Sequence, residues 1–280
     1  MIAAAIEPFA AATPPGSPRY FAWLYARPEQ RPMVELTFAL EYELSASVRS
    51  GIDHAVAHAR LDWWQAEAEQ LIAGAARHPL TESLCTARLQ QGLGQPDLRA
   101  LVATLRWDLA AATLPSQQAA DHHAQAWSLA IFEPVVESLR QQAQLNGGAD
   151  GTARDAVRHF AATAGQALGL ERASRRVCGS GSSEGNAALT MSTIQPSTLM
   201  RDARAQLHTA VASLPREQQA TLASVLVWLG CSYDALARQP DQPVATPWSM
   251  LRANLRAWRF ARRACRQAFQ LPPLMSRDLL

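Results

Sequence analysis

Apolar residues recur every three or four positions along most of this chain, and this spacing is the strongest constraint on its fold. One clear example is the set Leu36, Leu40, Leu44 and Val48, which the four-residue spacing places on one face of an α-helix. No segment shows sustained alternation of apolar and polar residues with β-branched side chains, the pattern expected of a half-buried strand. The spacing therefore predicts an all-α protein.

Turn-forming residues divide this helical pattern into segments. The pattern predicts helices over about 33–48, 52–75, 80–92, 97–112, 116–144, 151–177, 197–213, 216–238 and 246–268. Asp97, Ser116 and Thr152 suit the N-cap positions of three of them. We expect residues 1–18 to form a flexible arm, 19–270 a single domain and 271–280 a tail. Amphipathic helices with short breaks predict an antiparallel bundle around a central cavity.

Composition and charge limit the class of protein. A chain of 280 residues can bury roughly 75% of its unfolded surface, enough for one core. A net charge of +2 argues against a nucleic-acid-binding protein. The longest apolar run, residues 220–229, has about half the length needed to cross a bilayer, and the N-terminus is a poor signal peptide. We expect a cytoplasmic protein.

Three sequence features share one recognisable arrangement. Residues 59–67 read Ala-Arg-Leu-Asp-Trp-Trp-Gln-Ala-Glu, His-Pro-Leu follows at 78–80, and the apolar helix 33–48 precedes them. This arrangement resembles the squalene/phytoene synthases, all-helical enzymes that join two prenyl diphosphates head to head. The segment Leu-Arg-Ala-Trp-Arg-Phe-Ala-Arg at 255–262 is similar to the family's last helix. The resemblance spans about residues 18–268 and implies an isoprenoid synthase-like fold with Trp63 or Trp64 packed inward.

The resemblance also identifies where the family's metal ligands would stand. Members hold Mg²⁺ against diphosphate through two Asp-x-x-x-Asp pairs. The positions that match the first pair are Ser45 and Arg49. Arg175 matches an Arg before the second pair, but Arg176 and Ser180 stand where its two Asp would be. Because Mg²⁺ requires hard oxygen ligands, the resemblance implies this fold without metal or cofactor; only an active synthase would need Mg²⁺.

Two interpretations of these Arg residues stay open. Arg49, Arg175 and Arg176 could bind an anion directly, since guanidinium groups bind phosphate through paired hydrogen bonds. The favoured interpretation is a structural network in which they pair with Glu41, Glu43 and Glu171. Trp127 falls near a small residue of the family's middle helix, so we expect its large ring to fill part of the space for a prenyl chain.

Two further motifs have weak support. His54, His58 and Asp62 share one helix face and could begin a metal site, with His122 or His123 as a further ligand. A solvated polar face is the favoured interpretation. Residues 181–185 fit the Gly-x-Ser-x-Gly pattern of serine hydrolases, but no buried strand precedes them, so we expect a flexible loop.

The last helix combines an apolar side with a basic one. Leu251, Leu255, Trp258 and Cys265 form the apolar side. A stripe of Arg side chains lies beside it at spacings of 4, 3, 4 and 3: Arg252, Arg256, Arg259, Arg263 and Arg266. A helix with an apolar side beside a basic side can bind the inner face of an anionic membrane or an acidic partner. A purely structural Arg stripe is the narrowly favoured alternative.

Three functional hypotheses follow. The leading one is a catalytically inactive member that binds an isoprenoid or lipid ligand or a protein partner. The same group includes a mitochondrial complex I assembly factor without a complete aspartate set. The second is an active prenyltransferase that condenses two prenyl diphosphates. In that case the aspartate motifs have been matched to the wrong positions of this sequence. The third is a metal-free enzyme or carrier for a phosphorylated or lipid ligand.

Overall fold

The chain folds into helices throughout its described parts. The computed structural model describes residues 5–49, 51–91, 96–110, 116–144, 151–180, 195–236 and 247–272, and these ranges contain no strand, which confirms the all-α prediction. The elements are α1 (Ile6–Ala12), α2 (Pro18–Leu24), α3 (Arg31–Ala46), α4 (His54–Ile72), α5 (Pro79–Gln91), α6 (Leu98–Leu109), α7 (Gln117–Trp127), the π-helical segment η2 (Ser128–Phe132), α8 (Glu133–Gln144), α9 (Gly151–Ser180), α10 (Pro196–Ser213), α11 (Arg216–Gln219), α12 (Ala223–Leu236) and α13 (Pro247–Cys265).

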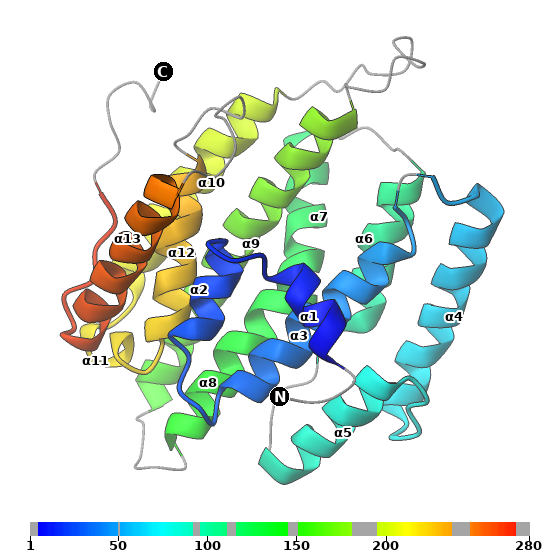
Figure 1. Ribbon diagram of the computed structural model, residues 1–280, viewed down its shortest axis with the longest axis horizontal. Coiled ribbons are helices and arrows are strands. Elements are labelled where there is room, and N and C mark those ends of the chain that lie inside the picture. The colour runs from blue at the N-terminus through cyan, green and yellow to red at the C-terminus, as the bar shows by residue number, and fades with distance from the viewer. Residues whose placement is uncertain are drawn as a thin grey trace.

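The long helix α9 lies in the middle of the bundle (Figure 1). It packs along α10 and α7, while α12 packs against α2 and α13, and α1 covers α3. In Figure 1, α12 and α13 form the left side and α4 the right side. No helix in the described ranges combines the length and the apolar character needed to cross a membrane.

The helix ends test the predicted caps. The Asp97 carboxylate accepts from the backbone N–H of Ala100 at 3.1 Å, and the Ser116 hydroxyl accepts from that of Ala119 at 3.2 Å, so both caps are confirmed. The expectation for Thr152 is wrong, because α9 already includes Gly151 and Thr152 lies within the first turn.

The N-terminal segment differs from the flexible arm that was expected. Residues 5–18 contain α1, which packs on α3 and buries Phe9. The Phe9 ring lies 5.4 Å from that of Trp23, so an aromatic contact helps to hold this segment on the domain. At the other end, the Tyr233 hydroxyl donates to the carbonyl of Pro272 at 3.0 Å, and the packed region continues past residue 270.

The expected helix over 116–144 is divided by a wider turn. Pro134, at the start of α8, has no N–H to donate to a carbonyl one turn earlier. The π-helical segment η2 lies directly before α8 and accommodates this missing hydrogen bond. The expected helix over 216–238 is likewise divided, into α11 and α12.

Aromatic side chains fill the middle of the bundle. The Trp228 ring lies 5.0 Å from Phe38 and 5.3 Å from Phe132, which joins α12 to α3 and η2. Trp64 is only 5% exposed whereas Trp63 is 47% exposed, so the prediction that one of the pair packs inward is confirmed by Trp64. Trp127 is 2% exposed and its indole N–H donates to Glu41 of α3; that its ring fills part of the space for a prenyl chain stays a prediction.

Helix α9 closely approaches α7 and the following segment η2 at two glycines. A Cβ added at Gly169 would lie 2.5 Å from the carbonyl oxygen of Ala124 on α7, and one at Gly165 would lie 2.0 Å from the Ser128 hydroxyl. Ala124 contributes backbone atoms, which cannot rotate away as a side chain can. The crossing of α7 and α9 therefore requires glycine at position 169.

The first prediction concerns this crossing. Gly169→Ala should destabilise the protein by about 1–3 kcal/mol, because the added methyl group overpacks a rigid contact. The measurement is urea unfolding followed by circular dichroism. Ala162→Gly, at an exposed position of α9, serves as the control for helix propensity alone and should cost about 1 kcal/mol. A Gly169→Ala variant more stable than the parent would contradict the close approach.

Candidate functional site

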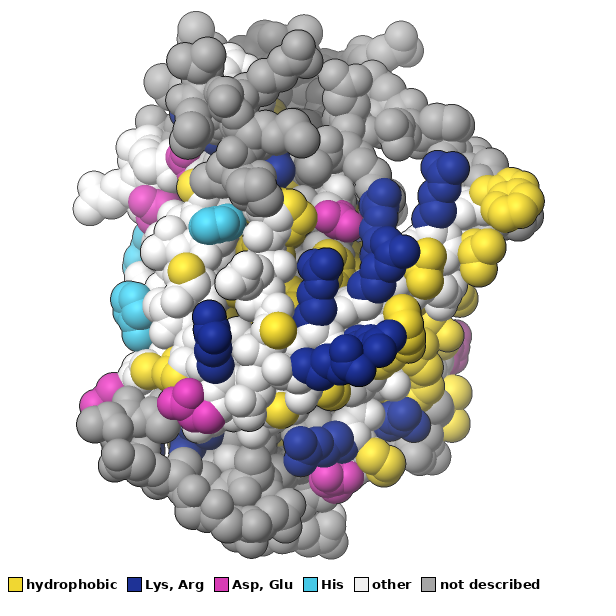
Figure 2. Space-filling view, turned by 90° about the vertical axis from the view of Figure 1, so that its left-hand side faces the viewer, with side chains coloured by type: hydrophobic (Ala, Val, Ile, Leu, Met, Phe, Trp, Pro, Cys, Tyr) yellow, Lys and Arg dark blue, Asp and Glu magenta, His cyan; other side chains and the backbone are white. Residues whose placement is uncertain are grey.

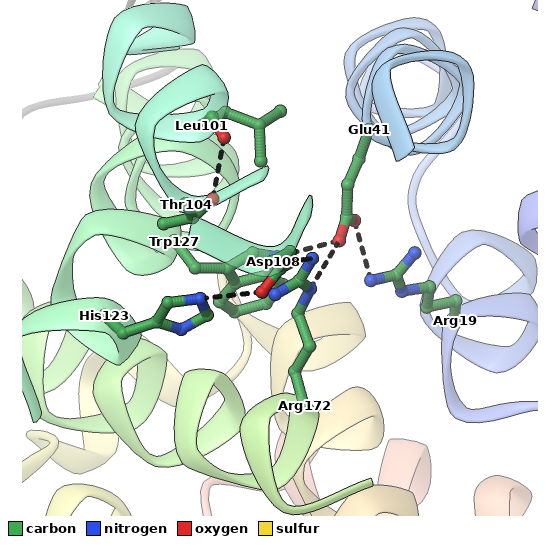
Figure 3. A network of polar contacts seen from close by, with 8 residues as sticks. All are labelled: Arg19, Glu41, Leu101, Thr104, Asp108, His123, Trp127 and Arg172. Atoms are coloured by element: carbon green, nitrogen blue, oxygen red, sulfur yellow. Dashed lines mark hydrogen bonds and ion pairs between the residues drawn. The ribbon is translucent and has the colours of Figure 1, made fainter. Parts of the chain in front are cut away.

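A buried group of charged and polar side chains joins five helices near the bundle centre (Figure 3). We call it the central ion cluster, and it comprises Arg19 on α2, Glu41 on α3, Asp108 on α6, His123 and Trp127 on α7, and Arg172 on α9. Figure 3 shows these side chains pointing toward one another from opposite sides of the bundle. The cluster therefore ties together helices that are distant in sequence.

Glu41 contacts three other members of the cluster. Glu41 is 4% exposed, and its Oε1 accepts from the indole N–H of Trp127 at 2.7 Å. Its Oε2 lies 2.7 Å from Nη2 of Arg19, and Oε1 lies 4.0 Å from Nε of Arg172. One carboxylate is thus shared between two guanidinium groups and an indole.

Asp108 forms the second acidic centre. Its side chain is 4% exposed; Oδ2 accepts from Nη2 of Arg172 at 2.7 Å, and Oδ1 lies 3.0 Å from Nε2 of His123. Two Arg and two carboxylates cancel in formal charge when His123 is neutral. The cluster is therefore electrically balanced by protein groups alone.

Burial keeps His123 neutral. Its pKa falls from 6.5 to about 4, chiefly because burial disfavours the imidazolium and secondly because the Arg172 charge lies nearby; the Thr104 carbonyl acts in the opposite direction. Nε2–H of the neutral ring then donates to Asp108. Burial also lowers the pKa of Arg172, while the Glu41 carboxylate acts to raise it.

The cluster lies one helical turn before the positions matched to the aspartate pairs. Glu41 precedes Ser45 by four residues on α3, and Arg172 precedes Arg176 by four on α9. Ser45 is half-buried, whereas Arg49 is exposed, with its guanidinium 4.3 Å from the ring centroid of Tyr42. The resemblance implies that Ser45, Arg49, Arg176 and Ser180 lie near one another around one cavity. The side chains of Arg176 and Ser180 are outside the described residues, so this stays a prediction.

The expected pairing of Arg with acidic residues holds in part. Arg175 pairs with Glu171 at 2.6 Å, and its side chain is 64% exposed. Burial raises the pKa of Glu171, and the Arg175 charge opposes this rise. Glu41 does pair with Arg, but its partners are Arg19 and Arg172 rather than the residues named from the sequence.

Glu43 lies elsewhere, at a pocket of about 350 Å³ between α3, α4 and the start of α5. The pocket is lined by Glu43, Ala46, Ser47, Arg60, Trp63, Trp64 and His78. Behind it, the buried Glu67 carboxylate accepts from the backbone N–H groups of Arg77 and His78 at 2.8 and 2.9 Å. Burial alone would raise the pKa of Glu67, but these hydrogen bonds and one from Thr81 lower it. Within residues 59–80, Glu67 therefore stabilises the turn that leads into α5.

The donor set does not fit the family's Mg²⁺ site. Ser45 and Arg49 bring no carboxylate, and the nearby buried carboxylates of Glu41 and Asp108 each bind Arg. Within the described ranges, no three His, Cys, Asp or Glu side chains gather closely enough to hold a metal ion.

The other candidate motifs are also placed. His54 and His58 are exposed with ring centroids 4.7 Å apart, but Asp62 of the same row accepts from Arg106 at 2.6 Å. His122 is exposed, and His123 belongs to the central ion cluster. The row thus acquires no third ligand among the described side chains. The Gly-x-Ser-x-Gly segment, 181–185, lies outside the described residues.

Arg19, Asp108 and Arg172 were missed by reasoning from the sequence. A usable signal existed, since Asp108 continues the buried stripe of Leu101 and Leu105 at helical spacing. A charged residue on an apolar stripe indicates a buried ionic partner. Which partner it meets depends on another helix, and the sequence does not reveal that.

The second prediction compares a buried ion pair with an exposed one. Glu41→Ala should cost about 3–5 kcal/mol of unfolding free energy, because Arg19 and the indole N–H of Trp127 lose their acceptor and the buried Arg172 keeps only Asp108. Asp62→Ala is the matched control: its side chain is 68% exposed, so loss of its pair with Arg106 should cost less than about 1 kcal/mol. Denaturant unfolding measures both, and equal losses would argue against the central role of Glu41.

The third prediction is a pH dependence. The folded-state pKa of His123 is depressed, so the unfolded chain gains a proton first as the pH falls, and stability decreases. Between pH 8 and pH 5 this group should remove about 2 kcal/mol. The pKa of His78 is also lowered by burial, so the test is the difference between the parent and His123→Asn. Urea unfolding over this range should give a flatter profile for the variant; identical profiles would show that His123 titrates normally.

Comparison with known proteins agrees with this architecture. The family model for squalene/phytoene synthase matches residues 13–259. No curated protein and no solved structure gives a significant match. The matched range includes all six residues of the central ion cluster and the two helices, α3 and α9, that contribute Glu41 and Arg172 to it. The chain belongs to the squalene/phytoene synthase family.

Proposed function

We propose that this protein is a catalytically inactive member of its family that works by binding an isoprenoid or lipid ligand or a protein partner. The observation that best supports this proposal is the central ion cluster. It commits the buried carboxylates of Glu41 and Asp108 to Arg19 and Arg172, one turn before the altered motif positions.

The family reaction begins when an allylic diphosphate leaves. Metal ions normally neutralise the charge that develops on that leaving group, an effect worth several kcal/mol. Ser45 and Arg49 cannot hold the metal through carboxylates. Recruiting Glu41 instead would take the ion-pair partner from Arg19, and recruiting Asp108 would leave Arg172 only its 4.0 Å contact with Glu41. Breaking a buried pair costs about 3–5 kcal/mol.

The filled interior bears on where binding occurs. Trp127 is 2% exposed and hydrogen-bonded to Glu41, so it closes the space between α3 and α7. Close contacts bring Gly169 of α9 against α7 and Gly165 against Ser128 of η2. These features favour a ligand or partner held at the surface over a long prenyl chain inside the bundle.

The fourth prediction tests for catalysis. Purified protein supplied with farnesyl or geranylgeranyl diphosphate and Mg²⁺ should release no pyrophosphate and form neither squalene nor phytoene. An active synthase of the same family, assayed in parallel, shows that the conditions support turnover. Ser45→Asp with Arg49→Asp should not restore activity, because the second pair is still absent. Mg²⁺-dependent product from the unmodified protein would contradict the proposal and favour an active prenyltransferase.

A binding measurement separates the remaining alternatives. If Arg49, Arg175 and Arg176 form a metal-free anion site, pyrophosphate should raise the melting temperature of the parent but not of Arg49→Gln with Arg175→Gln. Arg77→Gln with Arg158→Gln, at exposed positions elsewhere, is the charge-matched control. No shift in the parent would favour a protein partner or an uncharged lipid.

A further inference from the structure

Helix α13 has a fixed orientation on the bundle. Its buried side consists of Ala257, Phe260, Ala261 and Ala264, and it packs on α12. A Cβ added at Gly230 of α12 would lie 2.8 Å from the Phe260 ring, so the two helices are in close contact there. This packing determines which residues of α13 face outward.

The outward side carries a line of large apolar residues. Trp248, Leu251, Leu255 and Trp258 are 73%, 58%, 45% and 46% exposed, and their spacing of 3, 4 and 3 places them along one side of the helix. The sequence indicated an apolar side that includes Leu251, Leu255 and Trp258, and the structure places these residues in solvent. Four large exposed apolar side chains in a row are typical of a surface that binds something.

A basic stripe runs beside this apolar line. Arg252, Arg256, Arg259, Arg263 and Arg266 are all exposed, and α13 contains no Asp or Glu. Figure 2 shows Arg side chains gathered on this side of the molecule, with apolar side chains along its right-hand edge. The Arg256 guanidinium lies 3.5 Å from Asp234 of α12, and Arg262 lies over the Trp258 ring at 5.3 Å. The helix therefore presents apolar and cationic groups side by side.

We propose that α13 binds the surface of an anionic lipid bilayer, with the Trp and Leu side chains in the interfacial layer and the Arg side chains at the lipid phosphates. Helices that combine these two faces lie in the plane of the interface. Indole rings favour the headgroup level, and each Arg near an anionic surface adds to the attraction. This contact is independent of whether the protein is catalytic.

A lipid surface suits this helix better than a second copy of the chain. A copy that docked through the same face would bring its own Arg stripe, and α13 offers no carboxylate to meet it. A lipid bilayer satisfies both features at once, because phosphates and the apolar boundary lie in adjacent layers along the whole helix. Charge complementarity therefore favours an anionic bilayer.

The fifth prediction uses vesicle sedimentation. The parent should bind vesicles of phosphatidylcholine with about 30% phosphatidylserine but not phosphatidylcholine alone, and binding should weaken as salt rises. Arg252→Gln, Arg259→Gln and Arg266→Gln together should reduce partitioning by about 10- to 100-fold. The charge-matched control, Arg77→Gln, Arg158→Gln and Arg216→Gln, changes exposed residues on other elements and should leave partitioning near that of the parent.

A second pair of variants tests the apolar line. Trp248→Ala with Trp258→Ala should lower binding to the anionic vesicles, whereas Trp63→Ala on α4, at 47% exposure, should not. Unchanged circular dichroism and melting temperature establish that each variant is folded. Absence of binding to anionic vesicles, or equal loss in the controls, would overturn the proposal. A concentration-dependent dimer without lipid, abolished by the α13 Trp variants in sedimentation velocity, would assign this face to a second copy.

Discussion

The sharing of the Glu41 carboxylate between Arg19 and Arg172 is the interaction on which the centre of this bundle depends. In a poorly solvated interior, an ion that loses its partner is far less stable than one in water. Each helix that contributes a charge is therefore held in the one register that keeps the charges paired. Trp127 adds a directional hydrogen bond, so the cluster specifies geometry as well as charge balance.

The same arrangement limits the chemistry of the fold. A metal-binding carboxylate needs to be available to a cation from solution, whereas Glu41 and Asp108 are buried and bound by guanidinium groups. Structural charge balance and diphosphate ionisation thus compete for the same region of α3 and α9. Our proposal of a binding role follows from this competition, and the exposed face of α13 is the separate surface that we propose for contact with a membrane.

Much of the fold was predictable because helix formation is largely local. Periodicity predicted the helical segments from α3 onward but neither α1 nor α2, and the caps at Asp97 and Ser116 followed from side-chain chemistry at the helix starts. The failures have non-local causes. Phe9 anchors α1 through a contact with another helix, and the turn before Pro134 widens in response to a missing donor. At the site, Trp127 and the pair of Arg175 with Glu171 were anticipated, but the partners of Glu41 were not.

By itself the sequence determined the all-α class, the resemblance to the family and the absence of Asp at the matched positions, because each depends on residue type and spacing along the chain. Only the tertiary structure decided that Arg172 bridges Glu41 and Asp108, since these residues come from helices distant in sequence. It also decided that the Trp and Leu line of α13 faces solvent. Periodicity shows that a helix has an apolar side, but burial depends on which side meets a neighbouring helix.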